Sequence, residues 1–262
     1  MKFCNKYSGS RGNLTIVKTP HTTVLVDCGG GANRIFPAIS SCGLTPNDID
    51  AILVTHEHSD HIGGMEVLLN ANSKIKVFTH RLNANAVAEK TATHNKIVPF
   101  DAPFSVGDFG VEFIPCNHDS VFCCAYKLTD DKGRSVALLT DTGEIDDKTA
   151  FEFFKNCDTV LIESNHDVKM VNEGKYPYLL KKRILGKYGH LSNARASELV
   201  SGFLDINVKN VFLGHISLDN NTEEIAFGES LTALKKRGAI EGKDLNLFVA
   251  RQFVGGKEIN VD

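Results

Sequence analysis

The 262-residue sequence contains no run of 18 consecutive apolar residues, the minimum that suggests a membrane-spanning helix. Its first ten residues include Lys2 and Lys6, but no apolar stretch follows them, so no secretory signal peptide is expected. Both absences favour a protein that remains in the cytoplasm and is not anchored in a membrane.

Cysteine pairs with the spacing of a zinc ribbon are also lacking. The seven cysteines are an odd, scattered set without a C-x-x-C pair, which argues against a disulfide framework. Five of them stand in apolar surroundings and are expected to be small buried thiols: Cys28, Cys116, Cys123, Cys124 and Cys157. Free thiols are typical of a reducing compartment, which again indicates the cytoplasm.

A strong charge of either sign is missing as well. The 29 Lys and Arg residues against 32 Asp and Glu residues give a formal net charge of -3. The protein is therefore not expected to coat nucleic acid or membranes through its overall charge, and an anionic partner must be met by a local basic patch.

Length and patterning predict one domain over residues 1–262. With 42% hydrophobic residues the chain can bury a substantial core, and no internal repeat or linker interrupts it. Runs of β-type residues predict strands at 14–17, 23–26, 51–54, 75–79, 111–115, 123–128, 136–139, 159–162 and 210–214. Helical spacing predicts helices near 35–41, 64–70, 149–155, 194–204 and 222–236. We expect an α+β fold in which two mixed sheets pack together with helices outside.

Potential metal ligands are concentrated in one segment, Thr55-His56-Glu57-His58-Ser59-Asp60-His61, directly after a predicted buried strand. Imidazole nitrogens and carboxylate oxygens suit zinc, with manganese or iron as alternatives. The His-x-His pair can direct two imidazoles at one ion, while Asp60 and His61, at the start of a helix, can reach a second ion. The alternative is a polar loop whose histidines face solvent, but the density of ligands favours binding.

This segment resembles the signature of the metallo-β-lactamase superfamily, His-x-His-x-Asp-His, without departure. The resemblance implies an αββα four-layer sandwich and three further ligands, each just past a β-type run, where a sheet delivers side chains to one edge. The positions that match are His118, Asp141 and His215.

The resemblance also divides the ligands between two ions. It implies that the first ion is held by His56, His58 and His118, the second by Asp60, His61 and His215, and that Asp141 bridges them. Asp27, at the end of an early strand, matches an aspartate that supports the metal loop by hydrogen bonding more than by ligation. Three histidines off this pattern are expected at the surface: His21, His80 and His94.

Two divalent ions in such a site make hydrolysis the expected reaction. Ions about 3.5–4 Å apart can lower the pKa of a shared water toward ~7 and neutralise charge on a substrate oxygen. Asp60 is therefore counted among the catalytic residues as well as among the ligands. The metal site alone leaves amide, thioester, lactone and phosphodiester substrates open.

Two segments between Asp141 and His215 favour phosphodiesters: Glu163-Ser164-Asn165-His166-Asp167 and Gly189-His190-Leu191-Ser192. The tRNA-processing members of the superfamily carry comparable segments in the same order. In them the glutamate orients the histidine, which donates a proton to the departing oxygen. The resemblance thus makes His190 the general acid and Glu163 the residue that orients it. His166 has no role that the sequence derives and is kept as a candidate substrate contact.

One stretch of the chain is strongly basic. Residues 175–188 contain five basic residues, three tyrosines and no acid, a composition that suits phosphates and stacked bases. Lys181, Lys182 and Arg183 are therefore candidate substrate contacts. A solvated helix face with tyrosines packed behind it explains the same composition equally well.

The opening Ser8-Gly9-Ser10-Arg11-Gly12-Asn13 is a glycine-rich turn that can place amides and Arg11 near an anion. With the features above it makes the chain resemble the bacterial YycJ/WalJ-type branch, from Ser8 to about Asn221. Members of this branch are regarded as 5′ to 3′ DNA exonucleases, so the resemblance implies DNA as partner. Neither an inserted β-CASP domain nor a long tRNA-binding arm is evident, and the sequence does not indicate an oligomeric state.

Two other functions remain open. A small-molecule hydrolase acting on a cyclic or small phosphodiester, a thioester or a lactone would use the same metal ligands, but it leaves the basic stretch unexplained. A non-enzymatic metal-holding module is disfavoured because the complete ligand set is present.

Overall fold

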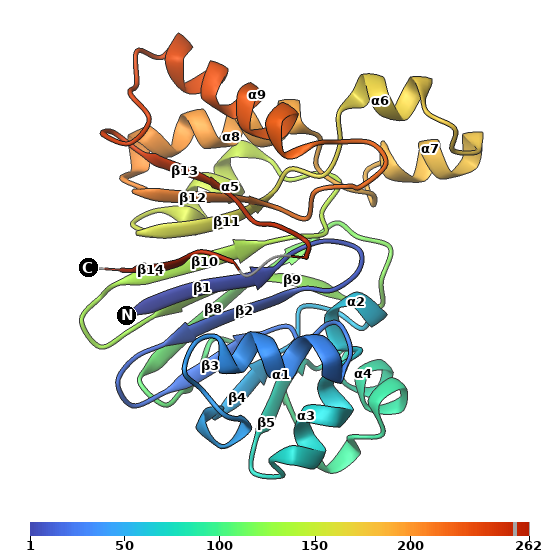
Figure 1. Cartoon of the computed structure of the whole chain (residues 1–262), viewed down its shortest axis with the longest axis vertical. Coiled ribbons are helices and arrows are strands. Elements are labelled where there is room, and N and C mark those ends of the chain that lie inside the picture. The colour runs from blue at the N-terminus through green and yellow to red at the C-terminus, as the bar shows by residue number, and fades with distance from the viewer. Residues whose placement is uncertain (254–255, 262) are drawn as a thin grey trace.

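Two mixed β-sheets form the centre of the computed structural model, which describes residues 1–253 and 256–261 (Figure 1). In the first sheet the strand order is β14 (Glu258–Asn260), β1 (Lys2–Tyr7), β2 (Leu14–Lys18), β3 (Thr23–Val26), β4 (Ala51–Leu53), β5 (Lys76–His80) and β6 (Ile97–Phe100). Neighbours pair antiparallel from β14 to β3 and parallel from β3 to β6. The pairing of β1 with β14 thus brings the first and last strands of the described chain together in one sheet.

The second sheet has the order β13 (Asn246–Val249), β12 (Asn210–Gly214), β11 (Thr159–Glu163), β10 (Ser135–Leu139), β9 (Cys123–Thr129), β8 (Phe109–Cys116) and β7 (Phe104–Val106). Its pairing is antiparallel from β7 to β10 and parallel from β10 to β13. The parallel strands of each sheet end at a common edge, so residues that follow them are brought together.

An apolar core fills the space between the sheets. Phe3, Val26 and Leu53 of the first sheet and Tyr126 and Leu138 of the second belong to one cluster of buried side chains. The Tyr126 hydroxyl also donates to the backbone oxygen of Val54, at 2.7 Å, which ties the strand before the histidine-rich loop to the second sheet. Removing this much apolar surface from water is the main term that holds the layers together.

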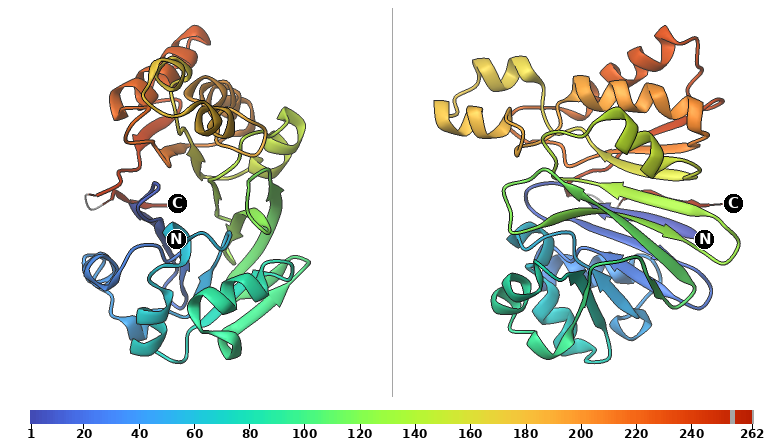
Figure 2. Two further views of the ribbon diagram at one scale, coloured as in Figure 1. Left: turned by 90° about the vertical axis from the view of Figure 1, so that its right-hand side faces the viewer. Right: turned by 180° about the vertical axis from the view of Figure 1, so that it is seen from behind.

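Helices cover the outer face of each sheet (Figure 2). The first sheet carries α1 (Ala32–Ser40), α3 (Met65–Ala71) and α4 (Ala84–Thr91), which share a buried apolar cluster with its strands. The second carries α5 (Asp147–Phe154), α8 (Asn193–Gly202) and α9 (Glu223–Lys236), again over one apolar cluster. The layers are therefore helix, sheet, sheet, helix, and the predicted α+β αββα four-layer sandwich is confirmed.

Two short helices extend away from these layers. The helices α6 (Val168–Glu173) and α7 (Tyr178–Ile184) project beyond the second sheet in both figures, and α7 contains the core of the basic stretch. In α6 the carboxylate of Asp167 accepts from the backbone nitrogen of Met170, which caps the helix start. Within the described ranges, no helix is both long and apolar enough to cross a membrane.

Candidate metal centre

The seven predicted ligands meet at the edge where parallel strands of both sheets end. His56, His58, Asp60 and His61 lie on the loop after β4 and on the short helix α2 (Ser59–Ile62) that follows it. His118 follows β8, Asp141 follows β10 and His215 follows β12. One sheet thus supplies four ligands and the other three, and together we call these seven residues the candidate metal centre.

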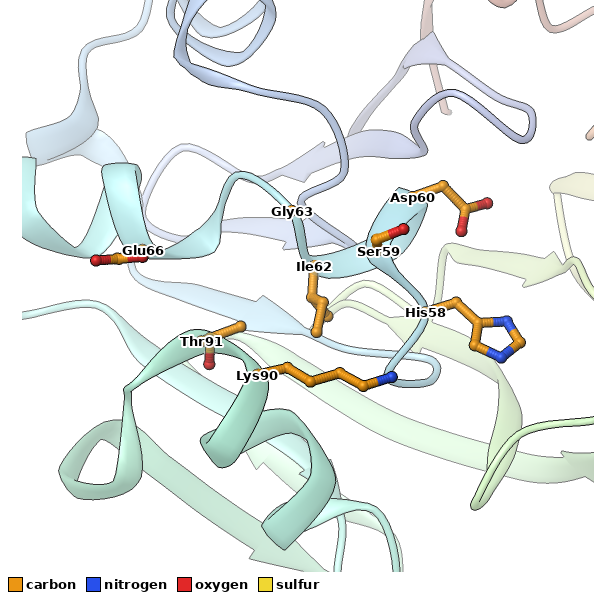
Figure 3. A pocket seen from close by; sticks show the side chains of 8 residues that line it. All are labelled: His58, Ser59, Asp60, Ile62, Gly63, Glu66, Lys90 and Thr91. Carbon is orange, nitrogen blue, oxygen red and sulfur yellow. The ribbon is translucent and has the colours of Figure 1, made fainter.

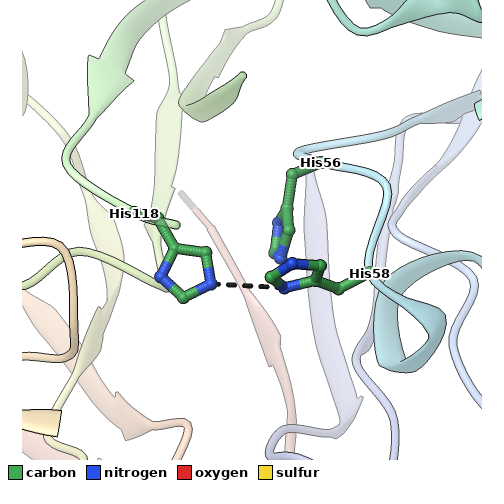
Figure 4. Close-up of side chains that lie close together, drawn as sticks. All are labelled: His56, His58 and His118. Atoms are coloured by element: carbon green, nitrogen blue, oxygen red, sulfur yellow. Dashed lines mark hydrogen bonds between the residues drawn. The ribbon is translucent and has the colours of Figure 1, made fainter. Parts of the chain in front are cut away.

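His56, His58 and His118 form a first triad (Figure 4). Their candidate ligand atoms all lie within 4.8 Å of one another, and His118 Nε2 is 3.3 Å from His58 Nδ1. His118 Nδ1 donates to the carbonyl oxygen of Gly189, at 3.2 Å, which leaves its Nε2 lone pair for the triad. Three imidazole nitrogens in this arrangement suit one transition-metal ion.

Asp60, His61 and His215 form a second triad. The Nε2 atoms of His61 and His215 lie 3.4 and 3.7 Å from Asp60 Oδ2. Asp141 stands between the triads, because its Oδ2 is 3.1 Å from His61 Nε2 while its Oδ1 is 3.8 Å from His118 Nε2. The Asp141 carboxylate thus faces both triads.

Several buried polar atoms of the centre are suited to binding a cation. Among the described residues, His56 Nε2, His215 Nε2 and Asp141 Oδ2 are buried without a hydrogen-bond partner. An unpaired buried polar atom is costly, and a metal ion would satisfy all three. Imidazole nitrogens and carboxylate oxygens are among the donors that bind zinc.

The buried carboxylates of the centre favour positively charged partners. Burial alone would lower the pKa of His215, but the neighbouring carboxylates of Asp141, Asp60 and Glu163 raise it to about 10. The pKa of His61 likewise rises well above its usual value, since the carboxylates that face it outweigh its burial. In the absence of an ion, protons on these two rings would balance the buried carboxylates, so metal binding must displace protons.

Asp27 holds His61 from behind the centre. Its Oδ2 accepts from His61 Nδ1 at 2.7 Å, and its Oδ1 accepts from the backbone nitrogen of Thr55 at 2.9 Å. This fixes the tautomer in which His61 Nε2 faces the second triad. Asp27 therefore acts on the metal loop through hydrogen bonds and reaches the centre through His61.

Three residues at these strand ends have a left-handed backbone. The φ angles are 60° at Asp27, 59° at Asp141 and 54° at His215, each within two residues of the end of its strand. This conformation costs a non-glycine residue on the order of 1–2 kcal/mol. Such strain is typical of functional sites.

Glu163 connects the centre to His190. Its Oε1 lies 2.8 Å from both His190 Nδ1 and His215 Nδ1, and its Oε2 accepts from the backbone nitrogens of Thr142 and Leu191. Burial opposes the charged form, but the two histidines hold the pKa of Glu163 well below its usual value. One carboxylate oxygen thus orients the predicted general acid and a ligand of the second triad together.

A cavity of about 240 Å³ opens over the centre. It is lined by six residues of the centre and its rim: His58, Asp60, His118, Asp141, His190 and His215. Ser10 of the glycine-rich turn and Tyr176, Leu180 and Arg183 of the arm that carries α7 complete much of the wall. We call this the metal cavity.

The predicted substrate contacts are distributed unevenly around it. Arg183 lines the metal cavity and makes a two-pronged ion pair with Asp119, the residue after His118. Lys181 and Lys182 line a different hollow, and the Lys181 ammonium donates to the carbonyl oxygen of Asn172 at 2.7 Å. The Arg11 side chain is exposed, and the lining of the metal cavity comes from its neighbour Ser10 instead.

His166 is buried and lies outside the metal cavity, where a substrate contact would be needed. It is 1% exposed and does not line the metal cavity, and its carbonyl accepts from the backbone nitrogen of Asn193 at 2.8 Å. Burial lowers the pKa of His166 to about 4, which keeps the ring neutral. The prediction that His166 contacts the substrate directly was therefore wrong. The residue lies in the interior, behind the segment that carries His190.

The three histidines outside the ligand pattern do not all lie at the surface. His21 is exposed, as expected, but His80 is buried and stacks on Phe122 with a ring-centroid distance of 3.8 Å. The prediction of a surface position for His80 was therefore wrong, because its ring packs against Phe122, Phe113 of β8 and Phe100 of β6. The side chain of His94 lies outside what the structure describes.

Asn13, Ser8 and Asn165 also support the centre, and sequence reasoning gave none of them a role. Asn13 Nδ2 is 3.0 Å from His61 Nε2, and Ser8 Oγ accepts from the backbone nitrogen of His215 at 2.9 Å. Asn165 Nδ2 donates to the carbonyl oxygen of His215 at 2.7 Å. The signal for the first two was the glycine-rich opening, whose polar side chains, rather than Arg11, reach the centre.

Comparison with known proteins gives relatives that agree with one another. Residues 22–216, which contain the whole centre, match a family model described as "Beta-lactamase superfamily domain". Exodeoxyribonuclease WalJ of Streptococcus pneumoniae serotype 2 is 34% identical, over 92% of this chain and 91% of that protein. Exodeoxyribonuclease YycJ of Bacillus anthracis is 35% identical over 88% of each chain. The solved metallo-beta-lactamase fold protein YhfI from Bacillus subtilis, 17% identical, superimposes with a TM-score of 0.74 over 98% of each chain and shows the fold alone.

Proposed function

Because this chain belongs to the beta-lactamase superfamily, and within it to the family of the exodeoxyribonucleases WalJ and YycJ, we propose that it is a two-metal phosphodiesterase that degrades DNA from the 5′ end. The resemblance read from the sequence is thereby confirmed at the level of the family. The metallo-β-lactamase fold implies a divalent metal, and the donor set supports two ions, with zinc preferred over manganese or iron.

The observation that carries this proposal is the Glu163–His190 pair at the rim of the centre. A nucleotide alkoxide is a poor leaving group and needs a proton, whereas many thioesters and activated esters do not. Glu163 accepts from His190 Nδ1 at 2.8 Å, which orients the ring. His190 Nε2 is then the atom that can donate a proton to a departing oxygen in the metal cavity that it lines.

The remaining residues of the centre bind and orient. The first triad would hold one ion, the second triad the other, and Asp141 would contact both. When bound, two such ions supply a nucleophile at neutral pH and neutralise charge on the substrate phosphate. Asp27 keeps His61 in place through its Nδ1 atom, and Arg183 offers a guanidinium to a phosphate in the metal cavity once it turns from Asp119.

The substrate and its location rest on the relatives and on chemistry. Both relatives are named exodeoxyribonucleases, which supports DNA over RNA. The described residues contain seven free cysteines and no disulfide, in keeping with a reducing cytoplasm.

The test compares substrate classes on one metal-loaded preparation. We expect a 5′-phosphorylated single-stranded oligonucleotide to be shortened stepwise to mononucleotides, while a thioester and a lactone are left intact. An Asp141→Asn variant, which weakens both sites, should lose this turnover. Consumption of the thioester or lactone with the oligonucleotide intact would instead identify a small-molecule hydrolase.

A further inference from the structure

A second cavity opens beside the metal centre, on the face of the His58 loop away from His190. Its volume is about 490 Å³, and it is lined by His58, Ser59, Asp60, Ile62, Gly63, Glu66, Lys90 and Thr91 (Figure 3). His58 and Asp60 line both cavities, whereas His190 and Arg183 line only the metal cavity. The residues His58 and Asp60 thus lie between two adjoining hollows, and their side chains point away from Ile62 and Lys90 (Figure 3).

Lys90 brings positive charge to the side of this cavity nearest the centre. It extends from α4 toward the loop that carries His58, and its ammonium donates to the carbonyl oxygen of Glu57 at 3.1 Å (Figure 3). Over residues 1–253 and 256–261 no carboxylate forms an ion pair with the Lys90 ammonium. An ammonium has three donors, so two remain for a ligand.

The rest of the lining limits what can bind there. Ile62 provides an apolar wall, and Glu66 places a carboxylate at the other end from Lys90 (Figure 3). A dense polyphosphate would be repelled by Glu66. A single nucleotide fits better, because it carries one phosphate for Lys90, an apolar base face for Ile62 and base amino groups that a carboxylate can accept from. The volume lies within the range of small-ligand sites.

We propose that this cavity is a second nucleotide subsite, in which Lys90 binds a phosphate one position away from the phosphate that is cleaved. The inference rests on the proposed nuclease function and extends it. Since His190 lines only the metal cavity, the departing nucleotide lies there, and the nucleotide that keeps the cleaved phosphate extends past His58 and Asp60 toward Lys90.

Binding tests the subsite without turnover. The metal-loaded protein is titrated with a single-stranded oligonucleotide whose phosphorothioate linkages resist hydrolysis, over a series of salt concentrations. One lost phosphate contact should lower the slope of log affinity against log salt by about 0.7. We expect this in Lys90→Ala, with affinity reduced roughly tenfold at low salt, while Lys90→Arg keeps most of the affinity. The control Lys74→Ala removes an exposed lysine that lines neither cavity.

Turnover separates binding from support of the His58 loop. On cleavable oligonucleotides Lys90→Ala should raise KM far more than it lowers kcat, and bis(p-nitrophenyl) phosphate, too short to reach Lys90, should be affected much less. Equal losses on both substrates would overturn the proposal and assign Lys90 a structural role through Glu57. An unchanged salt slope would overturn it as well. Lys90-dependent binding without any cleavage of DNA by the wild-type protein would leave the subsite standing and reject the nuclease function.

Discussion

A single buried carboxylate, that of Glu163, links two functions of the site. Its Oε1 accepts from His190 and from His215 at the same distance, 2.8 Å, while two backbone nitrogens hold its Oε2. The proposed general acid and a candidate ligand of the second triad are therefore oriented by one atom. Substitutions of His190 and Glu163 should have different consequences, because Glu163 hydrogen-bonds the candidate ligand His215 at 2.8 Å, whereas His190 Nδ1 lies 3.6 Å from the candidate ligand Asp141.

His190→Ala should slow DNA cleavage by something like the 10²–10⁴-fold typical of lost acid catalysis. Nitrophenolate leaves as a stable anion, so an activated nitrophenyl phosphodiester should be affected far less. Measuring kcat on both substrates checks this, with metal content and melting temperature followed in parallel. Equal losses on both substrates would remove His190 from the mechanism.

Glu163→Gln serves as the matched variant for this prediction. It should reproduce the selective loss on DNA and, in addition, weaken metal binding by about 10–100-fold, as is usual when the partner of a ligating histidine is changed. Metal content at limiting zinc distinguishes the two variants. Full metal affinity in Glu163→Gln would show that the contact with His215 is not important for ligation.

The elements that the sequence predicted are those whose own residues carry the signal. The strands β4, β11 and β12 are short apolar runs buried on both faces, and the helices α5, α8 and α9 have clear apolar spacing and polar caps. In contrast, β1 has the sequence KFCNKY, which looks polar and irregular. It becomes a buried strand because it lies between β2 and β14, and the pairing with β14, more than 250 residues away, cannot be revealed by a local pattern.

The site was predictable to a similar extent. The ligands could be found because each follows an apolar run that ends at one edge of a sheet. The burial of His166 could not, since it depends on the packing of the separate segment around Ser192 against it. Composition alone also could not distinguish Lys181, Lys182 and Arg183 from one another. The helix α7 separates them, because only Arg183 projects into the metal cavity.

This division of α7 leads to a prediction at the level of the element. Arg183→Ala alone should account for most of the loss of DNA affinity shown by the triple alanine variant of Lys181, Lys182 and Arg183. A hydrogen-bonded charge contributes on the order of 1.5–3 kcal/mol, or roughly tenfold to a hundredfold in affinity. The double variant of the two lysines should stay near wild type. Salt-dependent binding of a non-cleavable oligonucleotide measures all three.

Asp119→Asn is the control for the ion pair that Arg183 makes. Because Asp119 competes with phosphate for the guanidinium, its neutralisation should preserve or strengthen DNA binding. If Arg183→Ala and Asp119→Asn weaken binding equally, Arg183 serves to anchor α7 to the loop of His118 and does not contact phosphate.

The whole molecule is built from two halves with the same strand plan. Each sheet has three antiparallel pairings followed by three parallel ones, with β3 and β10 at the change. Asp27 follows β3 and Asp141 follows β10, with φ angles of 60° and 59°. Equivalent positions therefore hold two carboxylates with different tasks: Asp141 lies between the triads, and Asp27 supports His61 from behind.

Because the centre spans both halves, metal binding should stabilise the whole fold. The ligands extend from His56 to His215 and come together only in the folded chain, so an ion at 100 times its dissociation constant should add about 2.7 kcal/mol. For a chain of this size each kcal/mol shifts Tm by roughly 2–4 °C. Removing two ions with a chelator should thus lower Tm by on the order of 10–20 °C, and zinc should restore it, with elemental analysis showing close to two ions per chain.

Variants show whether this stabilisation passes through the candidate centre. Asp141→Ala removes the carboxylate that faces both triads, so its Tm should respond little to chelator or zinc. His21→Ala, an exposed histidine outside the centre, should keep the full response. A chelator that leaves the Tm of the wild-type protein unchanged while removing its metal would show that the ions do not hold the two sheets together. A full zinc response in Asp141→Ala would place the stabilising ion at other residues.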